Sequence, residues 1–181
     1  MQIKLSTLAI VMGFGMALPQ AYGLANPKEF AARVQKFPRS LPVGIFLMLL
    51  GTAWFVYYLS LESISDFANY KNVLLGGFAA VGISSCVFVQ DFLAVRGLAV
   101  VFLVLAKLMV DTARWNPSEW RLVIVIWAYV LVLAGMWFTV CPWHLRDILA
   151  WATANERRVR LGSVLRLAFG LFVAALGLTV L

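Results

Sequence analysis

The sequence predicts an all-α fold: a polytopic transmembrane helical bundle with six membrane-spanning helices and two interfacial amphipathic helices. Of the 181 residues, 63% are hydrophobic and 13% are charged, and the mean hydropathy is +0.91. A soluble domain is usually about half apolar and a quarter charged. Several stretches reach the ~17–25 apolar residues that a helical span requires. These runs lack alternation of apolar and polar residues, which argues against a transmembrane β-barrel and favours helices.

We expect residues 1–181 to form a single integral membrane domain. The spans are expected at about residues 5–24, 43–61, 73–89, 92–114, 122–140 and 162–181. The first also has features of a signal peptide, because Lys4 precedes an apolar core and the small residues Ala21 and Gly23 follow it. We expect it to remain as an uncleaved helix.

Small residues at intervals of four predict close helix contacts in three of the spans. They are Gly13 and Ala17 in the first span, Gly76, Ala80 and Ser84 in the third, and Gly170 and Ala174 in the last. Without large side chains between them, two backbones can approach closely. These ridges suit packing within the chain, and the alternative is a surface for another subunit.

Two short amphipathic helices are expected on the membrane surface. The first begins at Asn26-Pro27, where Asn is a favoured cap and Pro a favoured first helical residue. Its apolar face consists of Phe30, Val34 and Phe37. The second begins at Pro142, and its apolar face consists of Leu145, Ile148, Leu149 and Ala152. Ile64 and Phe67 are further candidate surface anchors in a polar linker.

Two connections are predicted from local patterns. Asn116-Pro117-Ser118-Glu119 has the order of a helix cap and predicts the start of the fifth helix. Residues 156–160 predict a basic turn before the last span. Spans one and two, and spans five and six, are each joined by a proline-started amphipathic helix and a basic turn. This order suggests an internal repeat, although few residues are identical.

Charge bias predicts the orientation in the membrane. Six spans place the connections after spans one, three and five on one side, together with ten of the fifteen basic residues. Because basic residues accumulate on the cytoplasmic side, both termini are expected outside the cytoplasm. We expect an integral protein of the bacterial inner (plasma) membrane. If residues 90–115 only dipped into the membrane, the most basic loops would face opposite sides, so a true crossing is favoured.

The fourth span carries four charged residues on one helical face: Arg96, Lys107, Asp111 and Arg114. At ~100° per residue they fall within about 60° of one another. The opposite face consists of Leu98, Ala99, Val101, Phe102, Leu105 and Met109. Each charge costs ~2.5–3.5 kcal/mol at mid-membrane, so this candidate polar seam needs a neighbouring helix, water or headgroups.

Several interpretations of the polar seam stay open. In the first, the long side chain of Lys107 reaches the outer interface, and Asp111 neutralises the cluster. Asp111 is four residues after Lys107 and three before Arg114, and both spacings allow an ion pair on a helix. The seam can instead bind a solute, an ion or a lipid headgroup, or pair with another subunit. Arg96, beside Asp91, is interpreted as a topological anchor, with an anionic-lipid contact as the main alternative.

The residues typical of catalytic and metal sites are few. His144 is the only histidine, and together with Cys141 it supplies fewer ligands than a protein metal site usually has. Asp91 and Asp111 would lie ~30 Å apart on one helix, too far to form a dyad. Neither a phosphate-binding glycine loop nor a nucleophile–histidine–acid pattern is present. We therefore expect no metal or cofactor, and we favour a non-enzyme over an enzyme.

Our first hypothesis is an accessory or scaffold subunit of a membrane complex, without an evident catalytic site. The alternative is a small solute or ion transporter or channel that uses the polar seam, and a membrane enzyme comes third. The expected partners are a protein subunit or a second copy, and membrane lipids including anionic headgroups. Candidate headgroup contacts are Arg33, Arg39, Arg157, Arg158 and Arg160. Nucleic acid is not expected, because the basic residues flank apolar spans.

Overall fold

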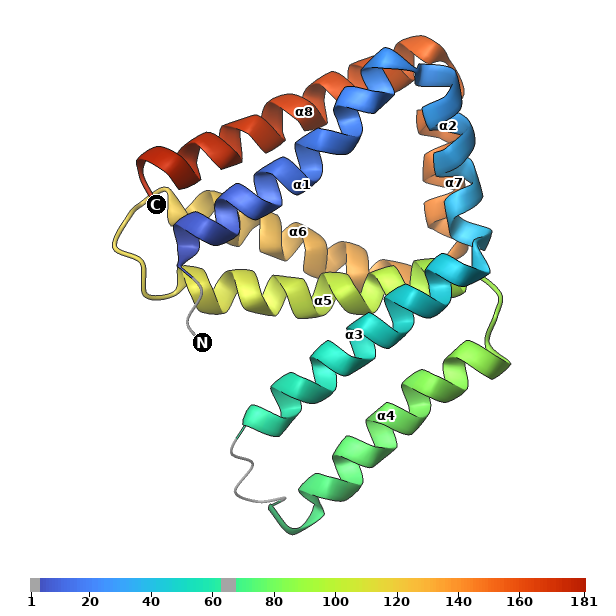
Figure 1. Ribbon diagram of the computed structural model, residues 1–181, viewed down its shortest axis with the longest axis vertical. Helices are drawn as coiled ribbons and strands as arrows, with labels where there is room; N and C mark the ends of the chain where they lie inside the picture. The colour runs from blue at the N-terminus through green and yellow to red at the C-terminus, as the bar shows by residue number, and fades with distance from the viewer. Residues whose placement is uncertain (1–3, 63–67) are drawn as a thin grey trace. The chain divides into compact units, whose positions relative to one another are not determined.

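The computed structural model describes residues 4–62 and 68–181, and within these ranges it is helical without any strand (Figure 1). Six of the described helices are long and apolar enough to cross a membrane. They are α1 (Leu5–Ala25), α3 (Leu41–Leu61), α4 (Lys71–Phe88), α5 (Leu93–Ala113), α6 (Arg121–Val140) and α8 (Glu156–Thr179). The shorter elements are α2 (Pro27–Lys36), α7 (Trp143–Ala152) and the 3-10 turns η1 (Phe37–Arg39) and η2 (Ala68–Tyr70). The all-α class and the six apolar helices are confirmed.

Two predicted connections are wrong in detail. The expected basic turn at residues 156–160 is the first part of α8, which begins at Glu156. An acidic residue in the first turn suits the positive end of the helix dipole. The expected cap at Asn116 is a turn, because the amide of Ser118 donates to Oδ1 of Asn116 over 2.9 Å and α6 begins only at Arg121. The candidate anchors Ile64 and Phe67 lie outside the described residues.

Helix α2, the first of the two expected surface helices, begins where the sequence predicts, at Pro27. The amide of Phe30 donates to the carbonyl of Asn26 over 3.0 Å, which closes its first turn. The ring of Phe30 lies against α1, because a methyl group added at Gly23 would be 3.2 Å from it. Part of the apolar face of α2 is therefore covered by protein.

The chain divides into two compact units. The terminal unit comprises Met1–Lys36, Leu105–Val132 and Arg146–Leu181, and the central unit comprises Phe37–Val104 and Leu133–Leu145. Helices α5 and α6 contribute residues to both.

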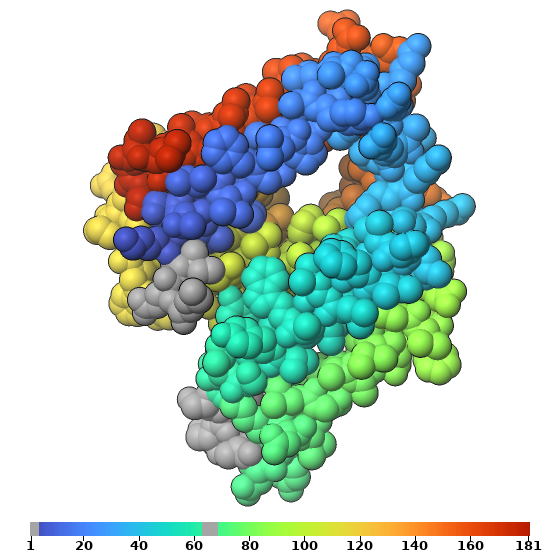
Figure 2. Space-filling view, in the orientation of Figure 1, coloured from blue at the N-terminus to red at the C-terminus, as the bar shows by residue number. Residues whose placement is uncertain are grey.

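In the terminal unit, α1 and α8 pack as an antiparallel pair with their backbones close together (Figures 1 and 2). A methyl group added at Gly13 would lie 2.5 Å from the carbonyl oxygen of Gly170 and 2.6 Å from the backbone nitrogen of Ala174. One added at Gly170 would lie 3.0 Å from the backbone nitrogen of Ala17. The close contacts predicted at these four positions are confirmed, and the two helices meet through them.

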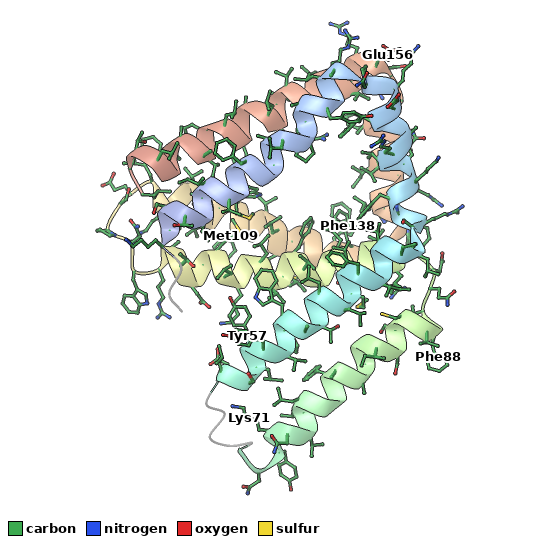
Figure 3. The ribbon with its side chains drawn as sticks, in the orientation of Figure 1. Tyr57, Lys71, Phe88, Met109, Phe138 and Glu156 are labelled. Atoms are coloured by element: carbon green, nitrogen blue, oxygen red, sulfur yellow. The ribbon has the colours of Figure 1, made fainter. Side chains whose placement is uncertain are left out.

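Other contacts surround this pair in the terminal unit. Helix α6 meets a different side of α8, where the rings of Trp127 and Phe169 lie edge to face with centroids 5.2 Å apart. The Gln35 amide donates to the hydroxyl of Thr153 over 2.8 Å and so links the end of α2 to the end of α7. The start of α8, marked by Glu156 in Figure 3, lies beside the start of α2.

In the central unit, α4 runs antiparallel to α3. The rings of Phe55 and Phe78 lie edge to face, 5.1 Å between centroids, and Gly82 lies directly against Thr52. At the far end, the ammonium of Lys71 donates to the carbonyl of Ser60 over 2.6 Å, and this lysine is labelled in Figure 3. Because Gly82 has no side chain, α3 and α4 can approach each other closely at Thr52.

Helix α5 packs on α3 in the parallel direction. A methyl group added at Gly44 would lie 2.7 Å from the backbone nitrogen of Ala94, and one added at Gly51 would lie 2.8 Å from the Val100 side chain. Gly97 faces α3 in the same way, because a methyl group added there would lie 2.7 Å from the backbone nitrogen of Met48. The directions of α3, α4 and α5 therefore alternate. Helix α5 is unbroken from Leu93 to Ala113 and is long and apolar enough to cross a membrane.

The order helix, short helix, long helix occurs twice with matching spacing. Pro27 follows the end of α1 by two residues, and Pro142 follows the end of α6 by two residues. Leu41 at the start of α3 lies fourteen positions after Pro27, and Glu156 at the start of α8 lies fourteen positions after Pro142. Both short helices have ten residues. This spacing is consistent with the predicted internal repeat.

Enlarging Gly13 is expected to separate α1 from α8. Gly13→Leu forces bulk against the backbone of α8 and should lower the free energy of unfolding by about 1–3 kcal/mol, as overpacking does. Gly15→Leu is the matched control, because a methyl group there meets nothing within 4 Å. Unfolding of both purified variants in detergent checks this, and equal stability of the two would contradict the proposed packing role of Gly13.

Candidate functional site

The four residues of the predicted polar seam lie along α5 and just beyond its end. Arg96 is in the first turn of the helix and belongs to the central unit. Lys107, Asp111 and Arg114 belong to the terminal unit, and all three are exposed. Arg114 directly follows the helix, and its amide still donates to the carbonyl of Val110 over 2.9 Å.

Lys107 and Asp111 form the ion pair expected from their spacing. The ammonium lies 2.9 Å from Oδ2 of the carboxylate, and the side chains are 42% and 51% exposed. Residues four apart lie one above the other on a helix, so the pair is local and requires no neighbouring helix. The carboxylate of Asp111 thereby neutralises one of the basic groups on this face.

The second predicted contact, between Asp111 and Arg114, is not among the ion pairs of the described residues. The guanidinium of Arg114 lies instead 5.2 Å from the centroid of the Trp115 ring. The backbone carbonyl of Arg114 accepts a hydrogen bond from the guanidinium of Arg121 over 3.3 Å, and this contact helps to shape the loop before α6. Arg114 is therefore held by an aromatic ring and a loop contact.

The charged face of α5 lies largely opposite its buried face in the terminal unit. Ala106, Met109 and Ala113 are buried, and they lie well away from Lys107 and Asp111 around the helix. Met109, labelled in Figure 3, is fully buried. Within the terminal unit the ionised pair is thus on the accessible side of α5.

Arg96 is placed differently from the other three. Its residue is half-buried, and its Nε atom is buried without a hydrogen-bond partner among the described residues. Nearby in the same unit, the guanidinium of Arg39 lies 6.0 Å from the centroid of the Phe92 ring. Phe92 has a positive φ of 53°, unusual for a bulky residue, at the reversal between α4 and α5.

The candidate headgroup arginines of the terminal unit lie on or near α2, α7 and the start of α8. Arg33 lies 5.1 Å from the centroid of the Tyr22 ring, and Arg158 lies 5.0 Å from that of Trp151. Arg160 is 3.9 Å from the carboxylate of Glu156. Arg157 is exposed. Their placement on one end of the unit is compatible with headgroup contact.

One polar contact was missed by the sequence reasoning. The guanidinium of Arg166 on α8 donates to Oε1 of Gln20 on α1 over 3.3 Å. Gln20 is only 8% exposed, and Ser163, one turn before Arg166, is fully buried beside Gly23. The signal was present as polar residues inside two apolar spans, but the pairing depends on the register of α1 against α8.

Acidic and metal-binding side chains do not gather in the described part of the chain. No group of three His, Cys, Asp or Glu residues close enough to hold a metal ion is found there. The ring of His144 contacts two indoles, with its centroid 5.4 Å from that of Trp137 and 5.8 Å from that of Trp143. This arrangement is typical of an aromatic belt at an interface.

No protein-family model matches the chain, and neither the curated proteins nor the solved structures contain a match.

Replacing only one residue of the Lys107–Asp111 pair should disfavour membrane insertion more than replacing both. In a bilayer, Lys107→Leu leaves an unpaired carboxylate, which should disfavour insertion by less than the ~2.5–3.5 kcal/mol of a mid-span charge, because Asp111 is near the helix end. Lys107→Leu with Asp111→Leu should insert at least as well as the natural chain. A glycosylation-based insertion assay measures this, with Thr112→Leu as the neutral neighbour. Equal insertion of the single and double variants would show that the pair is irrelevant.

Proposed function

We propose that the chain is one integral membrane domain in which α1, α3, α4, α5, α6 and α8 span the bilayer and α2 and α7 lie at one interface. The proposal is supported by large apolar side chains exposed on these helices, such as Leu18 at 68%, Leu133 at 68% and Val140 at 75%. In water, extended apolar patches of this kind favour association, whereas acyl chains cover them at no cost.

The proposed orientation places α2, α7 and the start of α8 on the cytoplasmic side. Ten of the fifteen basic residues belong to that side. The hydrogen bond from Gln35 to Thr153 and the 3.5 Å ion pair of Lys28 with Glu156 support a common side for these elements. Both termini are then outside the cytoplasm, and the membrane we propose is the bacterial inner membrane.

Cysteine labelling tests the orientation. The background is Cys86→Ser with Cys141→Ser, so that each introduced thiol is the only one. A membrane-impermeant maleimide added to intact cells should label Glu119→Cys, in the loop between α5 and α6. It should reach Asn155→Cys, before α8, only after permeabilisation. The reverse pattern would invert the topology, and labelling of both in sealed cells would exclude it.

Within the membrane we propose a role as an accessory or scaffold subunit that binds another protein through α4. This helix is the least buried of the six. Phe78 and Gly82 face α3, whereas the ridge of Gly76, Ala80 and Ser84 lies on the opposite face and is exposed. This ridge carries the proposal.

The α4 ridge has the properties of a helix-docking face that is not used inside the chain. A methyl group added at Gly76 or Gly77 meets nothing within 4 Å, unlike those at Gly13 and Gly170 of the α1–α8 pair. Small residues at intervals of four allow a second helix to approach its backbone, and the contact is made by dispersion and weak hydrogen bonds. The side chains that flank the ridge are Val73 and Val87, which are 70% and 60% exposed.

Purification from native membranes in a mild detergent tests this role. Gly76→Leu should abolish retention of a partner subunit, measured by quantitative mass spectrometry, while leaving the melting temperature unchanged. Val81→Phe is the matched control, since Val81 is 64% exposed on α4 but lies off the ridge. A lone monomer from the natural chain, or identical partners with Gly76→Leu, would count against the proposal. A lone chain would favour transport along the charged face of α5.

A further inference from the structure

The start of α8 carries two arginines on one ridge with a glycine between them. Arg158, Gly162 and Arg166 are four residues apart, so they follow one another along the same side of the helix, with ~12 Å of axial rise from first to last. We name these three residues the arginine notch. All belong to the terminal unit.

The guanidinium of Arg166 is folded back over Gly162. Its Nη1 donates to Oε1 of Gln20 over 3.3 Å, and its Nη2 would lie 3.0 Å from a methyl group added at Gly162. Side chains on a helix lean toward its start, so this arginine extends in the direction of Arg158. Gln20 is nine-tenths buried and therefore holds the guanidinium from a fixed position on α1.

Arg158 is held at the other end of the notch by α7. Its Nη1 donates to the carbonyl of Trp151 over 3.2 Å, and its guanidinium lies 5.0 Å from the centroid of the Trp151 ring. The indole of Trp151 is 67% exposed, as expected for a ring at headgroup depth. Two arginines are thus oriented by neutral groups on neighbouring elements, and the glycine between them lets the guanidinium of Arg166 lie over the helix surface.

The two positive charges of the arginine notch are not paired with carboxylates of the described chain. Glu156, the nearest acid in sequence, lies 3.5 Å from Lys28 and 3.9 Å from Arg160. Within residues 4–62 and 68–181, no carboxylate lies at ion-pair distance from Arg158 or Arg166. Guanidinium groups bind phosphate strongly through paired hydrogen bonds, so a phosphate is the complementary group.

An apolar strip beside the notch indicates that the phosphate belongs to a lipid. Leu161 and Leu165, on the adjacent ridge of α8, are 60% and 63% exposed. We infer that the arginine notch binds the phosphate of an anionic phospholipid of the cytoplasmic leaflet, with its acyl chains along Leu161 and Leu165. A zwitterionic choline lipid would bring a third cation to the notch and is disfavoured. This inference rests on the membrane topology proposed above, and not on the role of α4.

The test uses the full chain in nanodiscs of phosphatidylcholine with 20% phosphatidylglycerol, followed by native mass spectrometry of the released protein. Arg166→Gln and Gly162→Leu should each lower retention of phosphatidylglycerol about tenfold, the loss expected for one charge-assisted contact of ~1.5 kcal/mol. Arg166→Lys should retain an intermediate amount. Arg121→Gln, the same charge change at the first residue of α6, should match the natural chain.

If Arg166→Gln unfolds, Gly162→Leu still tests the inference, because a Cβ at position 162 meets only the flexible end of Arg166 within 4 Å. Glycerol phosphate without acyl chains should not displace the lipid. Retention unaffected by both notch variants, an equal loss with Arg121→Gln, or full displacement by glycerol phosphate would each overturn the inference. Incorporation into nanodiscs and the cysteine labelling report separately on whether the topology itself is correct.

Discussion

The approach of two glycines, Gly13 on α1 and Gly170 on α8, fixes the geometry of the terminal unit. Under the proposed membrane topology, the hydrophobic effect gives little reason for two apolar helices to associate, so dispersion between closely packed backbones has to supply the attraction. The contact also sets the register. With Gly13 opposite Gly170, Gly23 meets Ser163 and Gln20 meets Arg166. The polar partners are thus matched by a contact between residues that have no side chains.

Much of the fold was predictable because a helix that can cross lipid needs a certain length and composition, and six helices of the described chain meet both requirements. The apolar runs located six helices, and spacings of four located the surfaces of α1 and α8. Helix ends were less predictable, because hydropathy reports where the chain can enter lipid and not where helical hydrogen bonding stops. Glu156 and its basic neighbours are poor membrane residues but acceptable in a helix, so α8 begins before its apolar run. Asn116 illustrates the reverse error, since its side chain can form a turn as readily as a cap.

The candidate sites divide in the same way between local and distant contacts. Lys107 and Asp111 were predicted as a pair because helical spacing alone brings them together. Arg114 had a competing partner in the next residue, Trp115, and that choice depends on side-chain orientation. The pairing of Gln20 with Arg166 joins residues 146 positions apart, and no pattern in a single sequence specifies such a register. The ridge of α4 shows that a small-residue pattern predicts a capacity for close packing without naming the partner.

The matched spacing around Pro27 and Pro142 has a consequence for how such a chain can change in length. Helices α4 and α5 separate the two similar segments, and α5 runs parallel to α3, so the pair returns the polypeptide to the end from which α4 departed. With an even number of helices between them, the second segment starts at the same end as the first. An odd number would reverse its direction. Under the predicted repeat and the proposed membrane topology, helices between the two copies are gained or lost as hairpins, because a single added helix would place α7 and the arginines beside it in the opposite compartment.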